Sequence, residues 1–510
     1  MIEGINLKKR FDQVVELYGK AECLRYEDQS FTYNEINLYS NQLANYIDQE
    51  YRLTPQEVVV IFNNKTVYGF SSMLACIKLG LIYVNLDITS PIERLEKIII
   101  RCAPSLLIND FTENSSFIEP FEDSDFSSLN IHDPLVANKL KNKSGKLENE
   151  VIIPDHFITY IMFTSGSTGF PKGAAMTHAN LMSLIEWSRA TYDITTNDVF
   201  TNVNPLYFDN SVFDFFASLF NAATLAPFSY ETLKDPNAIV KYANSVKPTI
   251  WFSVPSMLVY LLTTKALSEK DLTTLRVFTF GGEGFPKPKL KKLYELFGDR
   301  VELINVYGPT ECTCICSSYK ISEKDFEDMV SLASLGKIAP NFSAVLLDAK
   351  DGGFELGLSG TQIGVGYYND KERTEKSFIQ NPHNRLFREI IYKTGDLVSI
   401  DDQGYLFFNG RVDNQIKHMG YRIELEEIES IVNNISGVNE CGVIYKKLSI
   451  GGHIISYVAG ESNLNKEYLL QELRNLLPPY MIPKIIRIVD VLPKNRNGKI
   501  DRVELKKLEL

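Results

Sequence analysis

The sequence predicts an α/β protein with a large N-terminal domain of α/β subdomains, a β-rich subdomain and a small α+β C-terminal domain. Apolar strand-like runs alternate with helix-like runs over residues 57–109 and again over 157–305, as in parallel βαβ sheets. Residues 330–410 are rich in strand-like runs with short glycine-containing turns. Beyond residue 410, charged helical segments alternate with strands, which indicates a second domain.

The first α/β region can be divided into elements in chain order. Residues 1–60 have a helical pattern with a short strand pair around Cys23–Phe31. Five elements follow: strand Glu57–Phe62, helix Val67–Leu79, strand Ile82–Leu86, helix Pro91–Ile100 and strand Ser105–Asn109. Residues 111–150 are polar and poorly patterned, so we expect a surface excursion there.

The same patterns of apolar residues predict the strands and helices of the second α/β region and of the C-terminal domain. The expected strands are Phe157–Met162, Ile250–Ser253, Leu275–Phe280 and Val301–Asn305, and the expected helices are Leu181–Tyr192, Val212–Phe220 and Pro255–Thr263. The C-terminal elements are helices Leu425–Val432 and Asn465–Leu477 and strands Gly442–Tyr445, Gly452–Val458 and Ile485–Val489. We place a hinge at residues 411–413, between domains 1–410 and 414–510.

Composition narrows the function classes. The chain has 510 residues, of which 44% are hydrophobic and 23% charged, which is ordinary for a soluble globular protein. Its formal charge of −11 argues against nucleic acid or an anionic membrane as a general partner. No apolar run is long enough to span a bilayer, and the first residues lack the apolar core of a signal peptide. The seven scattered cysteines suit a reducing compartment, so we expect a cytoplasmic protein.

The loop Phe163–Gly173 is the strongest chemical signal. It follows an apolar strand and contains three glycines, four hydroxyl side chains and Lys172. Glycines let backbone N–H groups approach an anion, and hydroxyls and an ammonium add donors and charge. These properties favour a phosphate cradle over a solvated turn, although the loop lacks the G-x-x-x-x-G-K-[ST] pattern.

Three cysteines, Cys312, Cys314 and Cys316, invite a metal or redox interpretation. We favour a structural one, in which a strand places all three thiols on one face as small apolar side chains. No histidine or fourth cysteine lies near in sequence to complete a tetrahedral site.

Further phrases follow the loop in a fixed order: Phe208–Ser211, Gly281–Glu283, Asn305–Glu311, Tyr392–Asp396, Gly410–Lys417, Gly420–Glu424, Leu477–Pro483 and Asn497–Arg502. Together they resemble the adenylate-forming superfamily, and within it the amino-acid adenylation domains of nonribosomal peptide synthesis. Leu406–Arg411 and Ile423–Glu429 favour freestanding D-alanine:carrier protein ligases. The resemblance implies ATP and Mg²⁺ as cofactors, an amino acid as substrate, and a separate phosphopantetheinylated carrier protein as partner.

The resemblance also implies roles for individual residues. The β- and γ-phosphates would lie against Thr164, Ser165, Gly166, Ser167, Thr168, Gly169 and Lys172. Adenine would lie among Gly282, Glu283, Asn305, Tyr307 and Gly308, with Tyr307 stacked on the base. The ribose would be held by Asp396 and Arg411, the α-phosphate by Thr310 and Mg²⁺ by Glu311.

Two more roles concern the C-terminal domain. Lys499 lies in an Asn-Gly turn, where a lysine is ordinarily a solvated tip, but the resemblance makes it the catalytic cation. Asp413 would be the hinge residue. Rotation about it would remove Lys499 and bring in the loop Lys417–Gly420, where a glycine lets a pantetheine arm pass; the alternative for Gly420 is a simple turn residue.

Asp209 is the main indication of substrate class. In amino-acid-activating relatives an aspartate here pairs with the α-ammonium, whereas the alternative is an N-cap for the following helix. The other pocket positions map to Asn210, Phe213, Phe280, Gly281, Ile304, Val306, Lys337, Val345 and Leu346. Gly281 stands where D-alanine ligases have a cysteine, and Lys337 would favour an acidic or carbonyl-bearing substrate if it points inward rather than to solvent.

Two alternatives stay open. One is an acyl- or aryl-CoA ligase of the same superfamily, which Asp209 disfavours. The other is a degenerate, non-catalytic nucleotide-binding protein, which the intact set Lys172, Glu311, Asp396 and Lys499 disfavours.

Overall fold

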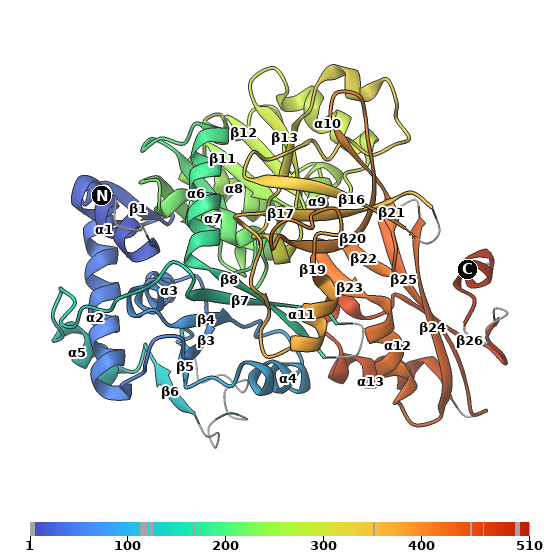
Figure 1. Cartoon of the computed structure of the whole chain (residues 1–510), viewed down its shortest axis with the longest axis horizontal. Helices are drawn as coiled ribbons and strands as arrows, with labels where there is room; N and C mark the ends of the chain where they lie inside the picture. Colours follow the sequence, from blue (N-terminus) through green and yellow to red (C-terminus); the bar gives the residue numbers. More distant parts are fainter. Residues whose placement is uncertain are drawn as a thin grey trace. The chain divides into compact units, whose positions relative to one another are not determined.

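The structure is a computed structural model that describes residues 6–112, 121, 126–166, 170–349, 352–448, 451–462, 464–494 and 500–508. Figure 1 traces the chain. It forms two compact units, each built from several chain segments. Unit 1 comprises Met1–Leu86, Cys102–Met162 and Gly173–Val412, and unit 2 comprises Asp87–Arg101, Phe163–Lys172 and Asp413–Leu510. Two segments that we expected in the N-terminal domain therefore belong to unit 2. They are the phosphate-loop segment 163–172 and the segment 87–101.

The larger sheet of unit 1 has nine strands in the order β15-β14-β13-β12-β11-β9-β10-β1-β2. Its six central strands are parallel, and β14, β15 and β2 are antiparallel additions. The strands are β1 (Glu22–Arg25), β2 (Ser30–Thr32), β9 (Val199–Asn202), β10 (Thr224–Pro227), β11 (Ile250–Ser253), β12 (Val277–Gly281), β13 (Glu302–Tyr307), β14 (Ser317–Lys320) and β15 (Lys337–Ile338). The helices between them are α6 (His178–Tyr192), α7 (Asn210–Leu219), η2 (Thr232–Lys234), α8 (Pro236–Val246), α9 (Pro255–Thr263), α10 (Lys287–Phe297), η3 (Thr310–Cys312) and η4 (Glu323–Phe326).

The second sheet has seven strands in the order β18-β8-β7-β4-β3-β5-β6. Its strands are β3 (Val58–Phe62), β4 (Ile82–Asn85), β5 (Leu106–Asn109), β6 (Ser127–Asn130), β7 (Ile158–Thr164), β8 (Lys172–Thr177) and β18 (Gly366–Tyr367). The helices of this part of the chain are α1 (Leu7–Tyr18), α2 (Tyr33–Tyr51), α3 (Val67–Leu79), α4 (Ile92–Cys102) and α5 (Pro134–Lys141). The phosphate loop joins the end of β7 to the start of β8.

A five-stranded antiparallel sheet completes unit 1, with the order β16-β17-β20-β19 and β21 paired to β20. Its strands are β16 (Phe342–Asp348), β17 (Phe354–Gly360), β19 (Phe378–Gln380), β20 (Ile390–Ile400) and β21 (Leu406–Arg411), and α11 spans Lys371–Ser377. This is the predicted β-rich subdomain.

Most of unit 2 is the C-terminal part of the chain. It contains the hairpin of β22 (Gln415–His418) and β23 (Tyr421–Glu424) and a sheet of β24 (Val438–Leu448), β25 (Gly451–Gly460) and β26 (Ile485–Ile488). The helices are α12 (Leu425–Asn433), α13 (Lys466–Leu476), η5 (Pro479–Met481) and α14 (Arg502–Lys507). Ile428, Val443 and Leu469 are among the buried side chains of its core.

The predicted α/β fold class is confirmed, and the limits of α3, β11 and α9 match the prediction. Two predictions were wrong. The excursion 111–150 contains strand β6 and helix α5. The segment Cys312–Cys316 is not a strand, because η3 ends there and Thr313 and Cys314 have positive φ values of 55° and 76°. Its three thiols are nevertheless buried, as expected for packing residues.

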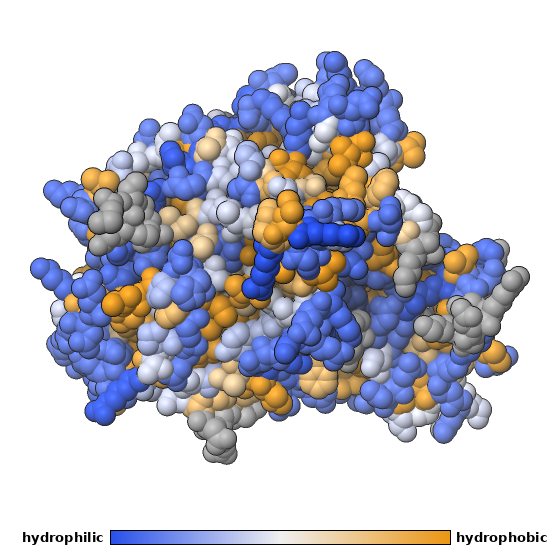
Figure 2. Space-filling model, viewed as in Figure 1, coloured by the Kyte–Doolittle hydropathy of each residue, from blue (hydrophilic) through white to orange (hydrophobic). Residues whose placement is uncertain are grey.

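Hydrophilic residues cover most of the face shown in Figure 2, with small apolar groups between them. No helix in the described part of the chain combines the length and apolar character needed to cross a membrane.

Candidate active site

Tyr307, Asp396 and Arg411 form one buried polar cluster in unit 1. Tyr307 ends β13, while Asp396 and Arg411 are partners in the register of β20 and β21. The Tyr307 hydroxyl donates to Asp396 Oδ2 at 2.6 Å, and the Arg411 guanidinium donates to Asp396 Oδ1. The structure thus brings together the residues assigned to the base and to the ribose.

The predicted adenine wall lies at the ends of β12 and β13. Gly282 has φ of 91°, which favours glycine. Glu283 accepts the backbone N–H of Ser256 at 2.8 Å, so its carboxylate holds the start of α9. Asn305 Nδ2 donates to the Ser334 carbonyl at 2.8 Å, which fixes the amide and leaves its carbonyl oxygen as an acceptor for a base. Gly308 packs so closely on the Cys314 carbonyl that a Cβ atom there would clash.

Asp209 precedes α7 and is 8% exposed. It stands at the N-cap position but makes no side-chain capping hydrogen bond, so the N-cap alternative is wrong. Its Oδ2 instead accepts from the Thr310 hydroxyl at 2.5 Å. The Asp209 carboxylate is therefore oriented by Thr310, the residue assigned to the α-phosphate.

Glu311 is fully buried in η3. Its Oε1 accepts from the Tyr367 hydroxyl at 2.6 Å, and its backbone carbonyl accepts from Gly364 N–H at 2.9 Å. Sequence reasoning missed Tyr367, which has no local signal because it meets Glu311 across 56 residues of sequence. A fixed carboxylate suits Mg²⁺, which binds few protein carboxylates together with phosphate oxygens. Among the described residues no group of three or more acidic, histidine or cysteine side chains could hold a metal ion.

The apolar pocket candidates are buried side chains: Phe213, Phe280, Ile304 and Val306, beside the buried polar Asn210. Gly281 lies so close to the Val306 carbonyl that any Cβ atom would clash, so a cysteine here would require β13 to shift. Lys337 is exposed, and its ammonium lies 4.7 Å from the centroid of the Tyr405 ring. The inward orientation considered for Lys337 is therefore wrong, because a cation–π contact holds the side chain outside.

In unit 2 the phosphate loop binds carboxylates. Gly166 N–H donates to Glu427 Oε2 at 3.1 Å, and Lys172 Nζ lies 3.5 Å from Glu424 Oε1. Ser165 Oγ donates to the Arg422 carbonyl at 2.6 Å. The loop thus offers an inward N–H and an ammonium to anionic oxygens, as a phosphate cradle must. Ser167, Thr168 and Gly169 lie outside the described residues, and the Thr164 hydroxyl is buried with no hydrogen-bond partner among those described.

Arg94 of α4 is a second residue that sequence reasoning missed. Its guanidinium donates to Glu427 Oε1 at 2.5 Å, and both side chains are nearly fully buried. The nearby Glu427 charge raises the pKa of Arg94 despite its burial. No local signal marks this pair, because the partners lie far apart in the sequence.

Asp413, the predicted hinge residue, begins the last segment of unit 2, which also contains the predicted loop Lys417–Gly420; Arg411 and Val412 belong to unit 1. Asp413 Oδ1 accepts from the Gln415 backbone N–H at 3.2 Å. Met419 and Gly420 form the turn between β22 and β23 with φ values of 53° and 81°, so Gly420 is in a conformation that the turn itself requires. Lys499 lies outside the described residues.

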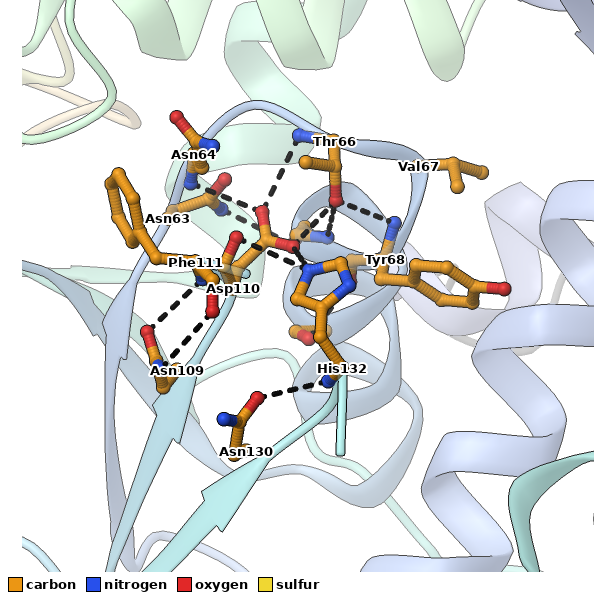
Figure 3. A network of polar contacts seen from close by, with 12 residues as sticks. Asn63, Asn64, Thr66, Val67, Tyr68, Asn109, Asp110, Phe111, Asn130 and His132 are labelled. Atoms are coloured by element: carbon orange, nitrogen blue, oxygen red, sulfur yellow. Dashed lines mark hydrogen bonds and ion pairs between the residues drawn. The ribbon is translucent and has the colours of Figure 1, made fainter. Parts of the chain in front are cut away.

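A separate polar network lies where β5 and β6 end (Figure 3). The buried Asp110 carboxylate accepts from the Thr66 hydroxyl at 2.5 Å, from Asn64 N–H at 3.0 Å and from His132 Nε2 at 2.9 Å. Thr66 in turn caps α3 by accepting from two backbone N–H groups. Because these bonds connect strand ends to a helix start, we assign the network to structure rather than catalysis.

This network predicts a pH-dependent contribution to stability. The hydrogen bond to Asp110 raises the pKa of His132. The stabilisation is therefore complete below the unfolded pKa of about 6.5 and is lost as pH rises through the higher folded pKa. His132→Gln should lower the free energy of unfolding clearly at about pH 5.5 and little at about pH 9. Urea titrations at both values test this, and an equal effect at both would contradict it.

Comparison with known proteins identifies the framework. The AMP-binding enzyme family matches residues 11–368, and the AMP-binding enzyme C-terminal domain matches residues 427–499. The D-alanine--D-alanyl carrier protein ligase of Bacillus cytotoxicus is 31% identical over 496 residues, covering 94% of this chain and 95% of that protein. Gramicidin S synthase 2 of Brevibacillus brevis is 30% identical over 508 residues, covering 98% of this chain but 11% of the synthase.

Solved structures agree on the fold. An NRPS protein containing adenylation and PCP domains has a TM-score of 0.83 at 24% identity, covering 99% of this chain and 84% of that one. The o-succinylbenzoate CoA synthetase of Bacillus subtilis has a TM-score of 0.84 at 22% identity, covering 98% of both chains. With the family match over most of its length and the motifs placed as described, the chain belongs to the AMP-binding enzyme family.

Proposed function

We propose that this protein activates an amino acid with ATP as an aminoacyl-adenylate, releases pyrophosphate, and transfers the aminoacyl group to the phosphopantetheine thiol of a separate carrier protein. Relatives named as D-alanine--D-alanyl carrier protein ligases match almost the whole chain, which supports this two-step activity. D-alanine is the first substrate to test because those relatives are named for it.

The observation that carries the amino-acid assignment is Asp209. This carboxylate is nearly buried, it does not cap the helix that follows it, and its Oδ2 accepts a hydrogen bond from the Thr310 hydroxyl. Burying a carboxylate is costly unless a cation compensates it. The α-ammonium of an amino acid supplies that charge, whereas a fatty or aryl acid does not.

The reaction has two half-reactions, and in each of them one bond forms and one bond breaks. A substrate carboxylate oxygen attacks the α-phosphorus, the bond from phosphorus to the β-phosphate oxygen breaks, and pyrophosphate leaves. The thiolate sulfur of the carrier then attacks the acyl carbon, the bond from that carbon to the phosphate oxygen breaks, and AMP leaves. The first half builds charge on phosphoryl oxygens, so it requires fixed donors and cations.

Different residues of this chain would bind the phosphates, stabilise the transition state and hold the metal ion. Lys172 and the N–H of Gly166 would hold the outer phosphates, and Lys499 would stabilise the charge of the transition state. The Thr310 hydroxyl, which donates to Asp209 in this structure, would turn to donate to the α-phosphate of bound ATP. Glu311 would hold Mg²⁺, which when bound neutralises phosphate charge. Tyr367 already orients the Glu311 carboxylate for that task.

The test is ATP–pyrophosphate exchange with purified protein, run with each of the twenty common L-amino acids and with several D-amino acids. We expect exchange that depends on one or a few amino acids. Exchange with fatty or aryl acids alone would establish the CoA-ligase alternative, and no exchange with any acid would support the non-catalytic alternative.

A further inference from the structure

The contact between Tyr307 and Asp396 links the nine-stranded sheet of unit 1 to its five-stranded sheet. Tyr307 ends a strand of the nine-stranded sheet, and Asp396 lies within β20 of the five-stranded sheet. Both side chains are buried, at 6% and 4% exposure. Tyr307, whose ring is assigned to stack on the base, therefore contacts the residue assigned to the ribose with its hydroxyl group.

The Asp396 carboxylate is held at both oxygens. Oδ2 accepts from the Tyr307 hydroxyl, and Oδ1 accepts from Arg411, whose guanidinium also donates to the Thr394 carbonyl at 3.2 Å. The backbone N–H of Asp396 is fixed as well, by Thr394 Oγ1 at 3.0 Å. Since each carboxylate oxygen can accept two hydrogen bonds, these two donors leave a second acceptor position on each oxygen.

Two remaining acceptor positions on one rigid carboxylate match a vicinal diol. The 2′- and 3′-hydroxyls of a ribose are such a pair. Burial and the Asp396 charge raise the pKa of the Tyr307 hydroxyl well above its ordinary value, so this group keeps its proton and acts as a donor.

We infer that the Tyr307 hydroxyl is a positioning group for ribose recognition: with Arg411 it holds Asp396 so that both carboxylate oxygens face the sugar diol. The inference rests on the proposed use of an adenine nucleotide but not on the identity of the amino acid. Tyr307 thereby serves base and sugar with different parts of one side chain, its ring and its hydroxyl.

Tyr307→Phe separates these two parts, because phenylalanine keeps the ring and loses only the hydroxyl. Calorimetry should measure binding of AMP, 2′-deoxy-AMP and 3′-deoxy-AMP to the full-length protein. We expect the variant to bind AMP on the order of tenfold more weakly. Its affinity for the two deoxynucleotides should fall much less, so that discrimination between AMP and each deoxynucleotide shrinks.

Two further variants sharpen the result. Tyr367→Phe removes an equally buried tyrosine hydroxyl that donates to a different carboxylate, Glu311, so it should leave the discrimination between AMP and deoxynucleotides unchanged. Asp396→Asn should reduce that discrimination, and adding Tyr307→Phe to it should cause little further change.

The outcomes distinguish the inference from the proposed function. Suppose that the unmodified protein binds AMP but Tyr307→Phe lowers the affinity for all three nucleotides by the same factor. The hydroxyl then has only a structural role, and the inference fails. If the unmodified protein does not bind AMP, the nucleotide function itself fails. If AMP binds as expected but no amino acid supports exchange, only the amino-acid assignment fails.

Discussion

Lys499→Ala should slow formation of the aminoacyl-adenylate by about 10²–10³-fold, the usual cost of losing one fixed donor to a developing charge. It should leave transfer from preformed adenylate to the carrier thiol nearly unchanged. The reason is that only the first half-reaction builds charge on phosphoryl oxygens. In the second half, the domain rotation implied by the family would have carried Lys499 away from the site.

The two halves can be measured separately. Pyrophosphate exchange reports the first half, and loading of a phosphopantetheinylated carrier from chemically prepared adenylate reports the second. Lys494→Ala is the matched control, because this lysine lies in the same segment and its ammonium pairs with Glu440 on an exposed face. The control should change neither rate by more than about twofold. Equal loss of both halves in Lys499→Ala would refute the assignment of Lys499.

The elements that sequence analysis located well carry complete local signals. Helix α3 begins after Thr66, whose side chain accepts from the N–H groups of Tyr68 and Gly69, and it ends at Gly80 with φ of 68°. Both ends thus follow capping chemistry that is readable from residue type. By contrast, β6 is an edge strand with mostly exposed side chains, so it lacks the apolar pattern that marks a strand.

Helix α5 was missed although its signal was present. Asp133 accepts from two backbone N–H groups and Pro134 occupies the first helical position, a combination typical of a helix start. The polar composition of residues 111–150 outweighed this signal. A short helix that buries little apolar surface leaves the capping residues as its main sequence signature.

In the candidate site, too, some residues could be predicted from the sequence and others could not. Motif residues such as Asp209, Tyr307 and Asp396 are named by the family resemblance, but their partners are set by tertiary structure. Tyr367 meets Glu311 across 56 residues, and Arg94 meets Glu427 across 333. Such contacts have no sequence period, so the hydrogen bonds that orient the functional carboxylates could only be found in the fold.

The second prediction with a large effect concerns Asp209. Asp209→Asn should lower kcat/KM for the amino acid by roughly 30-fold to 4,000-fold. This range corresponds to about 2–5 kcal/mol for removing one partner of a buried charge pair. Asparagine keeps a side-chain oxygen that can still accept from Thr310, so the change isolates the charge. The affinity for AMP, measured by calorimetry, should stay within about twofold because the asparagine oxygen can hold the Thr310 hydroxyl as the carboxylate does.

A substrate analogue supplies the decisive comparison. In the deamino acid, hydrogen replaces the α-amino group, so nothing remains for Asp209 to pair with. The unmodified enzyme should react poorly with this acid because the acid brings no cation to the nearly buried Asp209 carboxylate. Asp209→Asn removes that cost, so its rate with the deamino acid should equal or exceed that of the unmodified enzyme. If the substitution instead slows both acids by the same factor, Asp209 supports the fold of the pocket, and the amino-acid assignment loses the observation that carries it.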